Sequence, residues 1–271
     1  MTSKIRSQPR APSHVLLTSA AAAKALGVAV STLKRWADDG RIPHVRTAGG
    51  HRRFRPEDLQ IPAPSAPDSE AQAWITLLLS DADSHTVLGE LRRLRGSAGS
   101  WREASQRLAA ATRLLGERWA LGQLSIHEEH QATEKLARGV AHCSDALPLA
   151  PDAPVCLLAV PEHEEHSLGL TLLEPCLREL GWRTRWLGRK TPAAEVVAVV
   201  RTGHVQAVAL SASAHCRDAE ALAVVTATVG EVCREFGIPL LLGGTGAWPL
   251  TSPLAHRLTS LAELGPALAG R

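Results

Sequence analysis

The amino-acid sequence predicts a multidomain protein of the α + α/β class, on three observations. The first 60 residues are basic and contain short helical segments, residues 71–146 have a helical pattern without proline, and residues 152–271 alternate apolar strands with helices. At 271 residues the chain is long enough for two or three domains. We therefore expect a small N-terminal domain, a helical bundle and a doubly wound parallel sheet.

Charge separates the N-terminal domain from the rest of the chain. Residues 1–60 hold 11 Lys and Arg against 4 Asp and Glu, a net charge of +7, whereas the whole chain carries +3, so that the remainder carries −4. A basic module on a mildly acidic body indicates a nucleic-acid reader with a separate sensing part.

The composition also indicates the cellular compartment in which the protein is expected. The five cysteines have no paired metal-ligand spacing and mostly lie in apolar runs, so we expect reduced core residues of a cytoplasmic protein. Neither a signal peptide nor a membrane span is predicted, because the apolar runs are short. The chain offers no catalytic acid–base pair or nucleophile triad, so it is not predicted to be an enzyme.

The N-terminal domain is expected over residues 15–60, after a disordered basic tail of residues 1–14. Thr18 precedes a helix to about residue 26, and Ser31 precedes a second helix that Gly40 ends. Two short helices around a tight turn form a helix-turn-helix. Two short strands, 41–46 and 53–54, then flank a glycine-rich turn and form a hairpin, or wing.

Three segments, Ser31–Trp36, Gly40–Pro43 and Gly49–Phe54, resemble the winged helix-turn-helix of MerR-type regulators and excisionase-like proteins. That resemblance implies that the second helix enters the major groove of double-stranded DNA and that the wing reaches the backbone or minor groove. The implied DNA-binding residues are Ser31, Thr32, Lys34, Arg35, Arg41, His51, Arg52 and Arg53. The alternative is a solvated basic surface on a helical hairpin.

A proline-containing linker, residues 61–70, is expected to lead to the bundle at 71–146. Four helices are predicted there, at about 71–80, 84–95, 101–121 and 125–143. Their short connections favour a four-helix bundle.

The C-terminal domain, residues 152–271, contains the most informative motif. Its predicted strands are 155–160, 183–187, 206–211 and 239–243, and its predicted helices are 167–180, 192–202, 217–236 and 254–270. Glu164-x-His166-x-x-Gly169 lies between the first strand and the first helix, where open α/β sheets place ligands. Ser211-x-Ser213 follows after 41 residues, and Gly243-Gly244 after another 29.

This pattern resembles the cobalamin-binding signature of corrinoid proteins. The resemblance implies that His166 is the lower cobalt ligand, that Glu164 orients it, and that the serine and glycine elements line the slot for the displaced base. The implied residues on this side of the cofactor are Glu164, His166, Gly169, Ser211, Ser213, Gly243, Gly244 and Thr245. Two positions depart from the family: Glu164 stands where Asp is usual, and Ser213 where Leu is usual. Taken alone, His166 would be interpreted as a surface loop histidine, and the serine and glycine elements at this spacing favour the ligand interpretation.

Residues 117–130 of the bundle resemble the helical cap of CarH-type photoreceptors. That resemblance implies that Trp119, Ile126, Glu129 and His130 cover the upper face of the cofactor. The alternatives are a core tryptophan and a solvated Glu-His pair. Light-responsive members of this family carry a histidine directly after the cap tryptophan, and here that residue is Ala120, which cannot bind cobalt.

Three modules in this order resemble the CarH/LitR-type cobalamin-binding photoreceptor regulators of the MerR superfamily. The resemblance implies 5′-deoxyadenosylcobalamin as the cofactor, with methylcobalamin or hydroxocobalamin as alternatives. It implies a light-responsive repressor that binds promoter DNA as a dimer or tetramer. Two other interpretations stay open: a corrinoid carrier for methyl transfer, and a DNA-binding regulator with a vestigial or different sensor.

Overall fold

The computed structural model describes residues 16–26, 28–47, 49–59 and 66–269. The chain divides into two compact units, Met1–Ser65 and Ala66–Arg271. The expected tail of residues 1–14, Gly27 and residues 61–65 of the expected linker lie outside the described residues.

The N-terminal unit is a helix-turn-helix with a small antiparallel sheet. Its elements are β1 (Leu17–Thr18), α1 (Ser19–Ala25), α2 (Val30–Asp38), β2 (Val45–Arg46), β3 (Arg52–Phe54) and the 3₁₀ turn η1 (Pro56–Asp58). The predicted hairpin is present as β2–β3, and β1, which the sequence did not predict, pairs with the other side of β3. A fully buried core that includes Leu33, Ile42 and Phe54 holds the helices to the sheet.

The predicted N-cap is present in the first helix of this unit but not in the second. The Thr18 hydroxyl accepts a hydrogen bond from the Ala21 backbone N–H, as expected for an N-cap. Ser31 is not the cap of the second helix, because α2 begins one residue earlier and Ala29 is its N-cap, without a side-chain hydrogen bond. Gly40 follows that helix with a φ of 71°, a conformation that glycine adopts without strain.

The second unit begins with four helices. They are α3 (Ala66–Leu79), α4 (Ser84–Ala98), α5 (Trp101–Ala120) and α6 (Ile126–Asp145). The first starts at Ala66, so residues 66–70 belong to a helix rather than to the expected linker. Asp83, Ser100 and Ser125 cap the next three helices, and Gly99 ends α4 in the left-handed region, so residues 96–98 are helical rather than part of a connection. The four helices share one apolar core that includes Ile75, Leu91 and Leu136.

A parallel sheet with a doubly wound topology follows. Its strands are β4 (Val155–Pro161), β5 (Arg183–Thr191), β6 (Ala207–Ser211), β7 (Leu240–Gly243) and β8 (His256–Arg257), and its helices are α7 (Leu168–Glu179), α8 (Ala193–Val200), α9 (Ala219–Glu235) and α10 (Leu264–Ala269). The strand order is β5-β4-β6-β7-β8, and every pairing is parallel. The predicted helix at 254–270 is wrong: residues 256–257 form β8, and only 264–269 form an α-helix. The short strand extends the sheet because Leu258 N–H also bonds to the Leu242 carbonyl.

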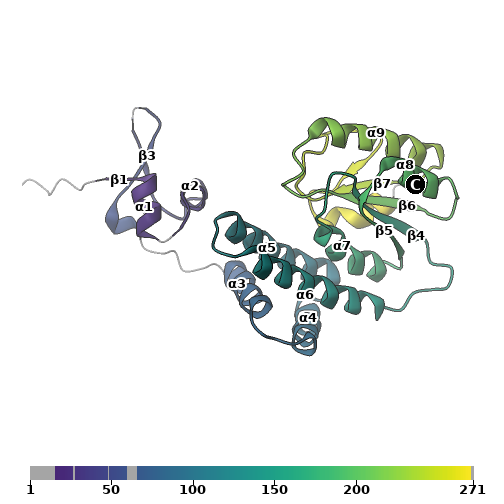
Figure 1. The fold of residues 1–271 in the computed structure, drawn as a ribbon, viewed down its shortest axis with the longest axis horizontal. Helices are drawn as coiled ribbons and strands as arrows, with labels where there is room; N and C mark the ends of the chain where they lie inside the picture. Colours follow the sequence, from purple (N-terminus) through teal and green to yellow (C-terminus); the bar gives the residue numbers. More distant parts are fainter. Residues whose placement is uncertain (1–15, 27, 48, 60–65, 270–271) are drawn as a thin grey trace, which may run out of the picture. The chain divides into compact units, whose positions relative to one another are not determined.

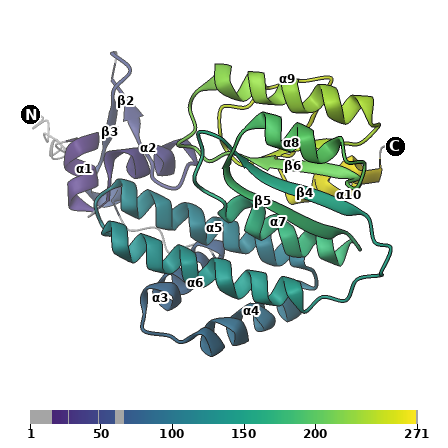
Figure 2. The same cartoon turned by 45° about the vertical axis from the view of Figure 1, so that its right-hand side comes forward.

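The two faces of the sheet have different coverings. Figures 1 and 2 show α8 and α9 on one face, and α7 on the other face next to α5 and α6. The core of the bundle therefore continues into α7, and residues such as Leu136 and Leu170 belong to one cluster. The topology reverses between β4 and β6, and the loops that follow these strands face the end of the bundle. Open sheets bind ligands at such a reversal.

No helix among the described residues is long and apolar enough to span a membrane.

Candidate functional site

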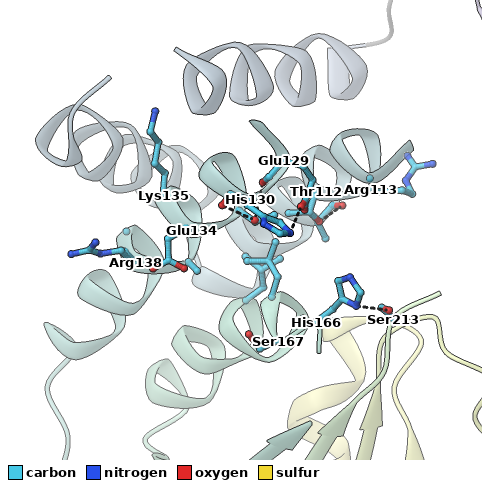
Figure 3. Close-up of a pocket in the computed structure, with 18 of the residues that line it drawn as sticks. Thr112, Arg113, Glu129, His130, Glu134, Lys135, Arg138, His166, Ser167 and Ser213 are labelled. Carbon is cyan, nitrogen blue, oxygen red and sulfur yellow. Dashed lines mark hydrogen bonds and ion pairs between the residues drawn. The ribbon is translucent and has the colours of Figure 1, made fainter. Parts of the chain in front are cut away.

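A cavity of about 2180 Å³ lies between the bundle and the carboxyl edge of the sheet. Pockets for drug-sized molecules are about 300–1,000 Å³, so this cavity can accept a much larger ligand. Nine of the predicted site residues line it: Trp119, Glu129, His130, His166, Gly169, Ser211, Ser213, Gly244 and Thr245. Figure 3 shows Glu129 and His130 on the bundle side of this space, and His166 and Ser213 on the sheet side.

Three predicted residues do not line the cavity. Ile126, the first residue of α6, is 62% exposed. Glu164 is 2% exposed and lies behind His166, and Gly243 is half-buried at the end of β7. The predicted position of Ile126 at the cofactor is therefore wrong in this structure, whereas Glu164 lies behind a residue that reaches the cavity.

The buried carboxylate of Glu164 organises the loop after β4. Its Oε1 lies 2.5 Å from His166 Nδ1 and accepts the backbone N–H groups of Glu165 and His166, both at 2.8 Å. Its Oε2 accepts the backbone N–H of Ser213, 2.6 Å away, in the loop after β6. One carboxylate therefore joins the two loops at the topological reversal of the sheet.

The charge state of Glu164 follows from these contacts. Burial alone would raise the pKa of this carboxyl, but hydrogen bonds from His166 and Ser213 outweigh burial and lower the pKa to about 2. The carboxylate is therefore ionised at neutral pH and can only accept hydrogen bonds, so it accepts the Nδ1–H of the His166 ring. Nε2 then keeps its lone pair, as a metal-ligating imidazole requires.

Ser213, one of the departures from the family pattern, contributes to this arrangement. Its hydroxyl oxygen lies 3.2 Å from His166 Nδ1, which is also the ring nitrogen that faces Glu164. A leucine at this position would have no hydroxyl to offer. Ser213 thus supports the orientation of His166 from the neighbouring loop.

The glycine elements are in close contact with the serine element. An added Cβ would come within 2.7 Å of Ser211 Oγ at Gly169, and within 2.1 Å of the Ala212 carbonyl oxygen at Gly244. Gly244 also has a φ of 80°. All three motif elements therefore meet at one point, and glycine is required there for close approach.

Sequence reasoning missed three residues that shape this site. Trp248 Nε1 donates to the Gly243 carbonyl at 2.7 Å, and Arg257 donates to the carbonyls of Leu242 (2.9 Å) and Gly244 (2.5 Å). These contacts fix the loop after β7. The third is His215, whose ring stacks on His166 with centroids 5.0 Å apart and lies 5.6 Å from the ring of Trp119. The sequence indicated His215 only through its position two residues after Ser213.

The bundle side of the cavity is less constrained. His130 Nε2 lies 3.6 Å from Glu129 Oε2, and the two side chains are 73% and 20% exposed. Trp119, near the end of α5, is half-buried. Ala120 is exposed and also lines the cavity.

Predicted DNA-binding residues lie on α2, the loop after it and the wing. Ser31 and Lys34 are exposed on α2, His51 is exposed before β3, and the Arg41 guanidinium lies 5.1 Å from the centre of the Trp36 ring. The wing turn is closed by hydrogen bonds between Thr47 and both Gly50 and His51.

Arg52 lies differently from the other predicted DNA-binding residues. Its side chain is 18% exposed, and Nη2 lies 2.5 Å from the Asp38 carboxylate, so it ties the wing to the end of α2. This ion pair lowers the pKa of Asp38. Arg52 therefore has a supporting role within the domain in this structure.

Comparison with known proteins begins with this N-terminal unit. Residues 16–60 match the family described as "Helix-turn-helix domain". The HTH-type transcriptional repressor CarA of Myxococcus xanthus is 34% identical over 125 residues, which cover 46% of this chain and 42% of CarA. The HTH-type transcriptional repressor CarH of the same organism is 25% identical over 265 residues, which cover 83% of this chain and 88% of CarH.

The chain is a homologue of these repressors. The similarity to CarH extends across both units, whereas the aligned part spans less than half of CarA. This similarity confirms the resemblance to CarH-type proteins that the motifs had indicated.

Solved structures resemble the chain more distantly. The monomethylamine corrinoid protein of Methanosarcina barkeri has a TM-score of 0.49 and 15% identity, over 74% of this chain and 97% of that protein. A cobalamin-binding protein of Desulfitobacterium hafniense has a TM-score of 0.36 and 19% identity, over 72% and 93%.

Proposed function

We propose that the chain is a transcriptional repressor whose DNA binding depends on adenosylcobalamin held in the cavity between bundle and sheet. The observation that carries this proposal is the Glu164–His166 pair. It fixes the proton on Nδ1 and leaves Nε2 of a cavity-lining imidazole available to cobalt.

The residues present fit such a cofactor. The cavity is about twice the upper end of ordinary ligand pockets. Beside it, the glycine element presents backbone without side chains: an added Cβ at Gly243 would meet the Leu210 carbonyl oxygen at 3.8 Å, and one at Gly244 would clash with Ala212. His166 would hold the lower face, and Trp119, Glu129 and His130 would border the upper face.

Regulation would follow from the division of the cavity between bundle and sheet. A ligand in contact with both Trp119 and His166 would stabilise the closed position of the bundle, and this position would favour a dimer or tetramer. Several helix-turn-helix domains in one oligomer would raise the DNA affinity through effective concentration. When bound, adenosylcobalamin would supply a cobalt–carbon bond that light can cleave. The exposed basic residues of α2 and the wing would contact promoter DNA.

The cofactor proposal is tested in the dark by absorbance titration of the ligand-free protein with adenosylcobalamin. We expect a bound spectrum in which histidine replaces the nucleotide base, and we expect His166→Ala to lose this signature and at least tenfold in affinity. His163→Ala is the matched control, because His163 is exposed in the same loop and is not among the residues that line the cavity. Failure of the wild-type protein to bind would leave the alternative of a vestigial sensor.

The regulatory proposal is tested by size-exclusion chromatography and DNA binding, before and after green illumination. We expect a larger species in the dark that binds promoter DNA, and a smaller, weakly binding species after light. Lys34→Ala should weaken DNA binding at all sequences. It should also reduce the slope of log affinity against log salt concentration by about one. Lys24→Ala, an exposed lysine in α1, is the control. A cofactor-bound oligomer that does not change in light would contradict the photoreceptor part alone.

A further inference from the structure

Arg257 is a half-buried residue that binds three backbone carbonyls at once. Its Nη1 donates to the carbonyls of Leu242 and Leu258, both at 2.9 Å, and its Nη2 donates to the Gly244 carbonyl at 2.5 Å. Gly244 is among the residues that line the cavity, and Arg257 is not. Arg257 therefore acts on the wall of the cavity through the backbone of another residue.

The short strand β8 brings Arg257 to this position. It is two residues long, lies at the edge of the sheet, and pairs with β7 in a register that sets Arg257 opposite Leu242. The glycine loop starts at the next residue of β7, Gly243. Because parallel neighbours end at the same edge of a sheet, the Arg257 side chain reaches the loop from an element that is separate from it in sequence.

The loop after β7 depends on its neighbours for rigidity. It holds three glycines within four positions, Gly243-Gly244-Thr245-Gly246. Glycine is the residue with the most backbone freedom to lose. Gly244 cannot be replaced by a stiffer residue, because its φ is 80° and an added Cβ would lie 2.1 Å from the Ala212 carbonyl oxygen. The conformation of the loop must therefore be fixed from outside, and the Arg257 contact with Gly244 does this.

Other contacts of the loop complete this support. The Gly246 N–H bonds to the Ala212 carbonyl at 2.9 Å, and Trp248 Nε1 bonds to the Gly243 carbonyl at 2.7 Å. Trp248 belongs to the segment that continues the loop, and Ala212 to the loop after β6. Arg257 adds a contact from a third element, the strand β8.

We propose that Arg257 is a positioning residue that fixes the glycine loop in the form that receives the nucleotide end of the cofactor. It would give the site its preference for a complete cobalamin over a corrinoid that lacks the nucleotide. This inference rests on the proposed function, in which the serine and glycine elements border the displaced base. A loop that is ordered before binding costs the ligand less on association, and only a ligand that contacts the loop gains from this.

A guanidinium suits this role because its two terminal nitrogens can bond acceptors on different elements. In Arg257, Nη1 serves the strand ends and Nη2 serves the loop. The single ammonium of a lysine could replace one of these nitrogens but not both.

The test compares hydroxocobalamin with hydroxocobinamide, which lacks the nucleotide, in absorbance titrations. We expect the wild type to bind hydroxocobalamin more tightly. Arg257→Gln should weaken hydroxocobalamin binding about tenfold and hydroxocobinamide binding by less than about twofold, and Arg257→Lys should lie between Arg257→Gln and the wild type. His256→Gln is the matched control, because it changes the exposed neighbour on the same strand and should leave both affinities unchanged.

A second measurement uses the ligand-free protein. Hydrogen exchange at the Gly246 amide should be faster in Arg257→Gln than in the wild type or His256→Gln, while exchange in β4 stays unchanged and shows that the sheet is folded. Unchanged exchange at Gly246 would overturn the inference. Equal weakening for the two ligands, no weakening for hydroxocobalamin, or equal affinity of the wild type for both would do the same. Absence of binding of either ligand by the wild type would instead overturn the proposed function.

Discussion

On the sheet side of the cavity, Glu164 is 2% exposed and joins two loops through the backbone of His166 and Ser213. On the bundle side, the His130 side chain is 73% exposed and its Nε2 lies 3.6 Å from Glu129 Oε2. The sheet side is therefore built before any ligand arrives, whereas the bundle side can adjust to what is bound. A site with one rigid and one adaptable wall can hold a constant group on the first and respond to a variable group on the second.

The largest expected effect tests the rigidity of the sheet side. Gly244→Ala should lower the free energy of unfolding of the ligand-free protein by about 3 kcal/mol or more, because the new Cβ adds a clash with Ala212 to the strain of a positive φ. Urea unfolding followed by circular dichroism measures this. Gly203→Ala is the matched control: its φ is 72°, but an added Cβ meets nothing within 4 Å. It should cost about 1–2 kcal/mol, and equal losses in the two variants would contradict the account.

The next effect tests the buried carboxylate. Glu164→Gln replaces an acceptor-only group by one that carries an N–H₂, so at least one of the donors from His166 and Ser213 loses its partner. We expect a loss of about 1–3 kcal/mol in the same unfolding assay, together with a tenfold to hundredfold weaker affinity for the cofactor. Glu162→Gln changes an exposed carboxylate in the same loop that is not among the residues lining the cavity, and it should leave both properties near wild type.

The bundle side should give the opposite pattern. Trp119→Ala removes a half-buried side chain at the end of α5 and should change stability less than Glu164→Gln does. It should instead reduce the preference for adenosylcobalamin over hydroxocobalamin by about tenfold, since Trp119 is proposed to border only the upper group. Titration with both cofactors measures this ratio. Trp186→Ala, on β5 and away from the cavity lining, is the control, and loss of affinity for both cofactors alike would show that the bundle side is not selective.

A further effect is expected from pH. The folded pKa of Glu164 is about 2, below its ordinary value of 4.5, so the carboxylate stabilises the fold above pH 4.5. That contribution is lost as the pH falls through the folded value. The stability difference between the wild type and Glu164→Gln should therefore narrow by about 2 kcal/mol between pH 5 and pH 2–3 in the ligand-free protein, and a constant difference would contradict the assigned ionisation.

Periodicity and turn residues predicted most of the fold. The strand–helix alternation predicted the parallel sheet, and the glycine-separated helical runs predicted the bundle. The short strand β8 could not be predicted, because His256-Arg257 has no apolar pattern and pairs only through its position beside β7. The early start of α3 was missed because Pro67 looks like a linker residue, although proline is well tolerated in the first turn of a helix.

The site was predictable where a motif carries it and not where tertiary contacts do. The motif Glu164-x-His166, Ser211 and Gly243-Gly244 indicated three loops, and residues from all three line the cavity. It gave no information on His215, which gains its position by stacking on His166, nor on Arg257, which reaches the Gly244 carbonyl from a separate strand. Arg52 was predicted to contact DNA from the resemblance of the wing motif to MerR-type regulators, but its ion pair with Asp38 depends on the folded position of the wing.

The central claim is that a rigid, carboxylate-oriented histidine holds the cofactor from the sheet side. The most direct measurement is the dark titration of wild type and His166→Ala with adenosylcobalamin, with the absorbance spectrum as the readout for the lower ligand. The account predicts a histidine-ligated spectrum in the wild type that disappears in the variant, while circular dichroism shows that both proteins are folded without cofactor. An identical bound spectrum in the two proteins would contradict it.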